Sequence, residues 1–226
     1  MANPGHVILL KKSIAEWNRW RKDYRSIQPD LEEADLKEVD IRNADLKKAI
    51  FDGANLNGAN FQGSDLGKAF FADADLQGAN LNETDCRGVV FKSTKLRGST
   101  FQKANLRKVD FSDLDLREVD FSEADLRKTD MRNSNLQEAR FFKSDLRDTL
   151  LSEANLAAAY LSSALMQGAH LQLANLNQAV LRYSMNLTPE QIQSAKIDRK
   201  TKVPYYLEIH WFSETEFSCE EKQTPQ

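Results

Sequence analysis

The 226-residue sequence has few of the residues that build disulfide frameworks, catalytic centres or membrane spans. Its only cysteines are Cys86 and Cys219, too few for a disulfide framework, and we expect both to be free thiols in a reducing compartment. The apolar run Val7–Leu10 is shorter than a signal-peptide core, and no stretch approaches the length of a transmembrane helix. These features predict a cytoplasmic protein.

A strong net charge is also missing, because 34 acidic residues nearly balance 31 basic residues and leave a formal charge of −3. This balance disfavours non-specific nucleic-acid binding, which usually requires a strongly basic surface. The sequence has no metal-ligand spacing, phosphate-binding loop or Ser/His/Asp set, and His6, His170 and His210 lie in three different segments. We therefore expect no catalytic residue, no metal and no cofactor.

What the sequence does contain is a period of five residues. Every fifth residue from Leu31 to Leu181 is apolar, thirty-one times in succession, with Cys86 the smallest. A second position repeats with the same period. Two residues before each of the apolar residues that follow Leu31, as at Ala34 before Leu36, the chain has Ala, Ser, Thr or Val, and Leu114 is the one exception. A period of five fits neither an amphipathic helix nor a plain strand. It predicts a short extended piece with two inward residues, followed by a turn, in a chain that closes into stacked coils.

A second period of twenty residues indicates how many units form one coil. The column that starts at Leu36 is leucine at every twentieth residue as far as Leu176. Phenylalanines form two further columns offset by ten residues, one with Phe51, Phe71, Phe91 and Phe111, the other with Phe101, Phe121 and Phe141. A coil of four units would place the two phenylalanine columns on opposite walls. Thirty-one units would then make about 7.75 coils, stacked at the distance that separates neighbouring strands in a sheet.

The repeated small–polar–large–polar–polar unit, as in Ala54-Asn55-Leu56-Asn57-Gly58, resembles the A(D/N)LXX repeat of the pentapeptide-repeat family. The resemblance covers residues 30–185 and implies an all-β solenoid, a right-handed quadrilateral β-helix with a solid interior. Its handedness rests on the resemblance alone. The N-terminal segment also resembles leader regions of cyanobacterial members of this family.

Both ends of such a solenoid need covering, because they expose unpaired backbone and core side chains. In the N-terminal region, residues 1–29, apolar residues at helical spacing over residues 6–25 predict an amphipathic α-helix that caps the first coil. Its basic face and tryptophans leave a membrane-surface helix as the disfavoured alternative.

The C-terminal region, residues 186–226, begins with a helix signal. Thr188 followed by Pro189 predicts a short capping helix that runs to about Ala195. Alternation over residues 203–212 predicts a strand that either folds back on the rod or pairs with a second chain. From Ser213 onward we expect a disordered tail.

Aspartates recur just before the large residue, and Asp45, Asp65 and Asp85 would stack on one wall. Calcium binding is one interpretation of such a ladder. We favour a structural role, because Asp and Asn side chains at a corner can accept hydrogen bonds from nearby backbone.

The outward residues of one wall form a candidate basic face. This wall has Leu46, Leu66, Cys86, Leu106, Leu126 and Leu146 in the core, and we call it the basic wall. Its candidate residues are Lys47, Lys68, Arg87, Arg107, Lys108, Arg127, Lys128 and Arg147. A lattice of Arg/Asp pairs between coils is the favoured interpretation, and a docking face for an acidic partner is the alternative.

Outward apolar residues form a second candidate surface. Ile50, Phe70 and Val90 replace the usual Asp or Asn at the corner on three successive coils, and Phe142 and Tyr160 lie further along the chain. A stacked cluster of exposed apolar side chains is typical of an interface, here with a partner protein or with a second copy in a homodimer.

These features predict a non-enzymatic protein-interaction or scaffold module with an unidentified protein partner. The alternative is suggested by the family resemblance: some members resemble DNA in shape and charge and bind type II topoisomerases such as gyrase. Such members look strongly acidic along the rod. Residues 30–185 carry a net charge of −5 here, but the basic wall weakens the likeness.

Overall fold

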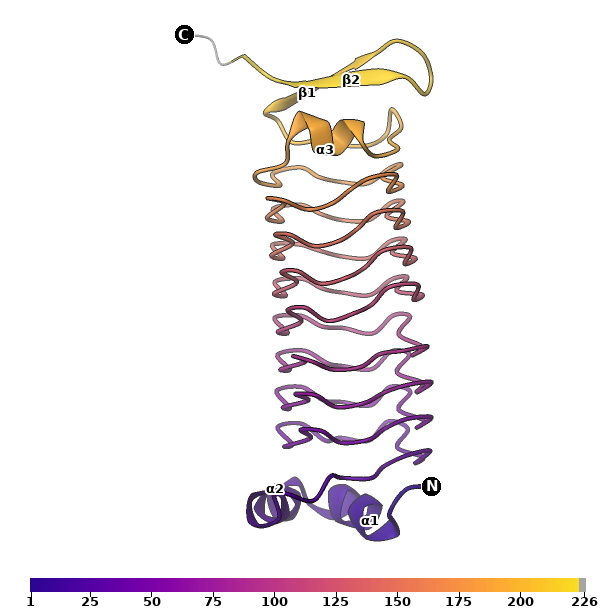
Figure 1. The fold of residues 1–226 in the computed structure, drawn as a ribbon, viewed down its shortest axis with the longest axis vertical. Coiled ribbons are helices and arrows are strands. Elements are labelled where there is room, and N and C mark those ends of the chain that lie inside the picture. The colour runs from indigo at the N-terminus through magenta and orange to yellow at the C-terminus, as the bar shows by residue number, and fades with distance from the viewer. Residues whose placement is uncertain (224–226) are drawn as a thin grey trace.

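The computed structural model describes residues 1–223 as one rod of stacked coils. Helices α1 (Pro4–Lys12) and α2 (Ile14–Asp23) lie at one end of the rod (Figure 1). Helix α3 (Pro189–Gln193) and strands β1 (Leu207–Trp211) and β2 (Phe217–Glu221) lie at the other. None of the helices within residues 1–223 has the length and apolar character that crossing a membrane requires.

Backbone hydrogen bonds between successive coils form the rod. Each pentapeptide contributes one bridged residue, which pairs in parallel with the residue twenty positions later, as Asp35 does with Asn55. Leu36 N–H donates to the carbonyl of Asn55 at 2.8 Å, and Asn55 N–H donates to the carbonyl of Ala34 at 3.0 Å. One coil therefore holds four pentapeptides, and the main-chain groups of one coil are satisfied by the next.

A tight turn follows each large residue. In the first unit the carbonyl of Leu31 accepts a hydrogen bond from Ala34 N–H at 3.1 Å, and Glu33 has a φ of 58°. A positive φ at the third residue is the mark of a type II turn, where glycine is favoured. Most of these turns instead carry Glu, Lys, Asp or Asn at that position, because the surrounding ladder holds the backbone there.

The corner aspartates hydrogen-bond the backbone, as the sequence predicts. Asp65 Oδ1 accepts from Gly67 N–H at 3.1 Å, and Asp75 Oδ1 accepts from Gln77 N–H at 3.1 Å. The same contact recurs at many other corners, where the side chain of Asp or Asn accepts from the N–H two residues later. The side chain thereby supports the chain as it enters each turn.

The core is filled by the thirty-one large residues, all of which are buried. Phe51 and Phe71 stack with ring centroids 4.8 Å apart, and Phe101 and Phe121 stack at 5.5 Å. The two columns meet edge to face across the core, where the rings of Phe91 and Phe101 lie 6.0 Å apart at 88°. Aromatic pairs favour both geometries, so the two phenylalanine columns fill the section between opposite walls.

The N-terminal region differs from the single helix that the apolar spacing predicts. Ser13 has an extended backbone, with φ at −163°, and separates α1 from α2. Its hydroxyl accepts a hydrogen bond from Glu16 N–H, so Ser13 serves as the N-cap of α2. The prediction of one continuous helix was wrong because a capping serine in the middle of the segment begins a new helix.

The C-terminal region contains more structure than the sequence predicts. Strand β1 pairs antiparallel with β2, with Ile209 opposite Cys219, so the strand predicted over residues 203–212 pairs with the chain's own tail. The prediction of a disordered tail from Ser213 was therefore wrong for residues 217–221. Cys219 is buried in this hairpin, and its burial gives the polar tail an apolar anchor.

The ladder also extends beyond the last regular repeat. Asn175 bridges Lys196 and Val180 bridges Lys202, so residues 186–202 add a further irregular turn to the rod. Helix α3 lies within this turn, and its N-cap Thr188 forms a capping box with Gln191. The inserted helix lengthens the spacing between bridged residues beyond twenty.

We expect Trp17→Ala to destabilise the N-terminal end of the rod. Trp17 is fully buried, and its Nε1–H donates to the carbonyl of Asp45 at 2.9 Å. Loss of such a side chain should lower the free energy of unfolding by about 3–5 kcal/mol. Urea denaturation followed by fluorescence tests this. The control Ile8→Ala removes an exposed side chain of α1 and should change stability by less than about 0.5 kcal/mol; equal effects of the two would contradict the prediction.

Candidate functional site

Arginines of the basic wall bind aspartates of the same repeat. The Arg127 guanidinium donates from Nε to Asp125 Oδ1 at 2.8 Å and from Nη2 to Asp125 Oδ2 at 2.6 Å. Arg147 binds Asp145 with the same geometry. A sequence of Asp, one core residue and Arg therefore forms a bidentate pair within one pentapeptide.

Three ion pairs of this wall connect successive coils, as the favoured interpretation of the sequence expects. Lys47 Nζ lies 2.6 Å from Asp65, and Arg127 Nε lies 3.4 Å from Asp145. Arg107 approaches the next coil only at 4.0 Å from Asp125. The expected pairing between coils therefore occurs, and an equal number of pairs is local, because two residues of separation place both side chains on the same outward surface.

A row of lysines on the same wall has no such partner. Lys48, Lys68, Lys108 and Lys128 occupy the turn position with positive φ on four coils. Within residues 1–223, none of these four lysines forms an ion pair. The basic wall thus divides into a largely neutralised arginine row and an unpaired lysine row.

The apolar candidates separate into two groups. Ile50, Phe70 and Val90 bridge one another on successive coils and form one continuous column, which we call the apolar strip. Phe70 is 37% exposed and Val90 is 40% exposed. Phe142 and Tyr160 are also exposed but belong to repeats offset by ten residues, so they lie on the opposite wall. The five residues do not form one surface.

Beside the apolar strip the ladder of hydrogen bonds opens. In the intact coils before it, Phe71 N–H donates to the carbonyl of Val90 at 2.9 Å and Leu76 N–H donates to Lys95 at 2.8 Å. In the next coil, all of whose residues the structure describes, the corresponding backbone bonds are broken or weakened. By donor and acceptor, the broken bonds are Ser93–Ser112, Leu96–Asp115 and Asp115–Thr94, and Lys95 forms no bridge with Asp115. Val90 still bridges Asp110, but the Phe91–Asp110 and Asp110–Val89 bonds of that bridge lack the close geometry of the other coils. We call this opening, between residues 91–96 and 110–115, the slit.

Leu114 accounts for the slit. It occupies the inward position that is Thr94 in the coil before and Ser134 in the coil after, and it is only partly buried. A leucine at this position adds volume that a filled core cannot accept without displacing the backbone. The interior stays in register, since Phe91 and Phe111 still stack at 5.1 Å. The strain is therefore released at the surface, where the two coils separate.

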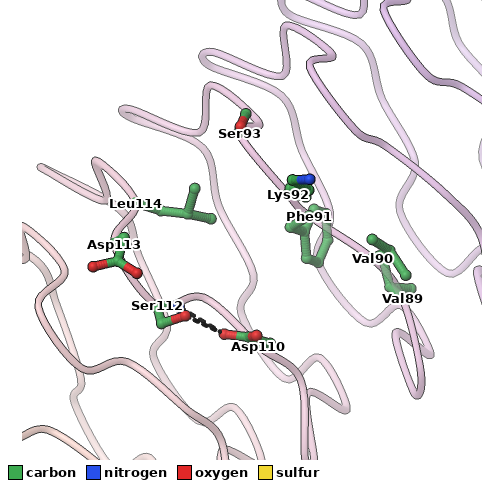
Figure 2. Close-up of a pocket in the computed structure, with 9 residues that line it drawn as sticks. All are labelled: Val89, Val90, Phe91, Lys92, Ser93, Asp110, Ser112, Asp113 and Leu114. Carbon is green, nitrogen blue, oxygen red and sulfur yellow. Dashed lines mark hydrogen bonds between the residues drawn. The ribbon is translucent and has the colours of Figure 1, made fainter.

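The space between the separated coils forms a pocket (Figure 2). Val89, Val90 and Phe91 line one side, and Leu114 points across the gap from the other. A second pocket lies on the far side of Leu114, next to Lys95 and Leu96. Since Val90 also ends the apolar strip, the strip continues into the slit as one apolar surface bordered by unpaired backbone groups. The sequence signal for this site is the single exception, Leu114, among the small residues.

The groups with catalytic or metal-binding chemistry lie apart from this surface. Cys86 is buried in the core, and burial raises its pKa to about 12, so it stays a thiol. His170 is exposed on the side of the rod. Glu208, His210 and Glu220 could offer ligand atoms within 4.8 Å of one another on the hairpin, but all three are exposed and His210 already pairs with Glu220 at 2.9 Å.

Sequence profiles match most of the rod. A profile of the pentapeptide repeat region matches residues 64–141, and a profile of eight pentapeptide repeats matches residues 30–67 and 144–182. The chain belongs to the pentapeptide-repeat family. Proteins of this family are generally non-enzymatic structural or interaction modules, and their fold is a right-handed β-helix.

Solved structures of other pentapeptide-repeat proteins resemble this one. HetL, involved in heterocyst differentiation regulation in the cyanobacterium Nostoc sp. strain PCC 7120, is 21% identical with a TM-score of 0.43, over 82% of this chain and 92% of HetL. A protein of the Arabidopsis thaliana thylakoid lumen is 28% identical with a TM-score of 0.23, over 57% and 66%. The plasmid-mediated fluoroquinolone resistance protein QnrB1 is 18% identical with a TM-score of 0.29, over 71% and 92%. No curated protein matched the sequence.

We expect Leu114→Ala to stabilise this pentapeptide-repeat protein, although it removes an apolar side chain. Alanine at this position would relieve overpacking that costs about 1–3 kcal/mol and allow the slit to close. The melting temperature should rise, and the amides of Ser93, Leu96 and Asp115 should exchange more slowly with solvent. The control Leu116→Ala deletes a fully buried side chain and should cost about 2–5 kcal/mol. A similar loss of stability in both variants would contradict our account of the slit.

The local arginine pairs predict a loss of stability in acid. Hydrogen bonds from Arg87, Arg117 and Arg132 lower the pKa of the carboxyls two residues before them, Asp85, Asp115 and Asp130. A lowered folded-state pKa contributes stability above the ordinary value of about 4, and this contribution is lost as the pH falls through the lowered pKa.

Melting temperatures measured from pH 7 down to about 2 test this effect. The variant with all three arginines replaced by glutamine should lose less stability than the wild type over the acid part of that range. The difference should be small, because the pairs are largely exposed. Identical pH profiles for the two proteins would contradict the prediction.

Proposed function

We propose that this protein is a non-enzymatic interaction scaffold that binds a partner protein along the apolar strip. The observation that carries the proposal is the continuity of the strip with the slit beside Leu114. Phe70 and Val90 offer exposed apolar area on a rigid rod, and the pocket beyond Val90 can receive an apolar side chain of the partner. A rigid surface also reduces the entropy that binding costs.

The unpaired backbone groups of the slit add a means of recognition. Ser93 N–H and Asp115 N–H have lost their ladder partners and can donate to a partner's main chain or polar side chain. An interface that combines an apolar anchor with a few directed hydrogen bonds is typical of protein recognition. The slit would supply both, while the strip alone supplies only the apolar part.

The terminal elements support the scaffold by covering its ends. At the N-terminal end, Trp17 is fully buried and Arg21 donates hydrogen bonds to the carbonyls of Ile27 and Lys47. At the C-terminal end, Tyr206 donates to the carbonyl of Ser184 and Gln191 donates to the carbonyl of Ala169. These contacts favour capping over membrane binding for residues 6–25, because they occupy the side chains that a membrane would need.

DNA mimicry directed at a type II topoisomerase is the alternative function. It draws support from the net charge of −5 on residues 30–185. The unpaired lysine row opposes it, since a surface that imitates DNA must be acidic along its length. A gyrase supercoiling assay separates the two functions: inhibition by the purified protein at micromolar concentration would favour mimicry over the scaffold.

Phe70→Asp should abolish partner binding. It places a charge in the middle of the apolar strip without touching the core, because Phe70 points outward. Affinity capture from the native cell with mass spectrometry should recover a partner with the wild type and lose it with this variant. The matched control is Phe142→Asp, which introduces the same charge at an exposed phenylalanine on the opposite wall and should keep the partner.

Light scattering completes the test by giving the mass of the purified protein. A wild-type dimer that Phe70→Asp converts to a monomer would identify the partner as a second copy of the chain. Recovery of the same proteins with the wild type and Phe70→Asp, with no change of mass, would refute the proposed binding surface.

A further inference from the structure

One repeat of the basic wall lacks the side chain that its neighbours share. The position directly after the core residue is Lys47, Gly67, Arg87, Arg107, Arg127 and Arg147 on six successive coils. Gly67 has no positive φ, so its backbone is one that any residue adopts. The neighbouring coils carry long basic side chains at the same place. The turn therefore does not require glycine, and the missing side chain leaves a recess.

The recess changes how the surrounding charges pair. Asp65 has no arginine in its own repeat and is bound by Lys47 from the coil before, at 2.6 Å. Asp85, one coil later, is bound by Arg87 of its own repeat at 2.5 Å. The two carboxylates that line the recess are therefore each matched by one cation.

Two further cations line the recess without a carboxylate of their own. Lys48 and Lys68 belong to the unpaired lysine row and stand at the edge of the recess, on the coils that carry Lys47 and Gly67. The lining thus holds four cations and two carboxylates, which leaves a charge of about +2 in a small concave surface. The other two lysines of the row have no such recess beside them. On the coils of Lys108 and Lys128, the position directly after the core residue carries an arginine and not a glycine.

We propose that the Gly67 recess binds a doubly charged anionic group on an acidic segment of a partner protein. Lys48 and Lys68 would donate charge-assisted hydrogen bonds to it, with Arg87 and Lys47 at the sides of the recess. A phosphorylated serine and a pair of neighbouring glutamates both present this charge. The site is separate from the apolar strip and does not depend on the function proposed for it.

Binding can be measured by fluorescence anisotropy with the full-length protein and labelled nine-residue peptides. Three peptides share one sequence and carry phosphoserine, two adjacent glutamates or serine at the centre. We expect the phosphoserine or the glutamate peptide to bind at least about tenfold more tightly than the serine peptide, the equivalent of one charge-assisted hydrogen bond.

Gly67→Arg is the decisive variant, because it adds a positive charge and yet should weaken binding by about tenfold. The new guanidinium would pair with Asp65, as Arg87 pairs with Asp85, and would fill the recess. A Cβ at position 67 would lie 3.2 Å from Asp65 Oδ1 and 3.8 Å from Lys47 Cγ, so the fold can accept the side chain with a small adjustment. Binding that stays the same or tightens would overturn the proposal, since it would reflect net charge alone.

A second pair of variants tests the lysines independently of Gly67. Lys48→Gln with Lys68→Gln should weaken binding by about tenfold, and glutamine is compatible with the positive φ because Gln178 adopts it. The matched control is Lys108→Gln with Lys128→Gln, which removes the same charge from the same row away from the recess and should leave the affinity nearly unchanged. Equal losses in the two double variants, or equal binding of all three peptides, would overturn the proposal.

The pH dependence of binding distinguishes the two sources of the anion. The second pKa of a phosphate monoester is about 6, so phosphoserine binding should strengthen between pH 5 and 7 as the group gains its second charge. Glutamates are largely ionised throughout this range, so their binding should stay nearly constant. The profile therefore identifies which of the two groups occupies the recess.

Discussion

Backbone hydrogen bonds between coils are the interaction on which the rest of this structure depends. Each coil offers its N–H and C=O groups to the coil twenty residues later, so the rod is held together by main-chain contacts that are the same for every residue type. Side chains therefore face two constraints. The inward ones must fill a core whose cross-section is the same in every coil, and the outward ones must be compatible with the turns. The outward surface is therefore free to vary.

That freedom explains why the surfaces form columns. A substitution at an outward position changes one point on a wall, and repetition every twenty residues turns several such points into a strip or a row. The arginine row lies next to corner aspartates and is largely neutralised by them. The lysine row occupies the turn position, one residue further from the aspartate, and stays unpaired within residues 1–223. Charge alone does not distinguish the rows; their place in the repeat does.

Both proposed binding sites arise where one residue departs from the repeat. Leu114 is too large for an inward position, and the ladder opens beside it. Gly67 leaves empty the space that a basic side chain fills on the other coils of this wall, and a recess lined by four cations forms there. In a regular solenoid a departure of this kind has a local effect, because each coil contacts only its neighbours. The stacking of Phe91 on Phe111 shows that the core beneath the slit keeps its register.

The five-residue repeat, the buried positions and the role of the corner aspartates could be predicted from the sequence, because they follow from a period that local chemistry imposes on every unit. Tertiary structure decided the rest. Ser13 divided the N-terminal helix, and the tail paired with residues 207–211. The slit and the partner of each arginine also depend on how neighbouring coils and side chains pack. All of these depend on contacts between residues distant in sequence or on competition between neighbouring side chains, which a repeat pattern does not encode.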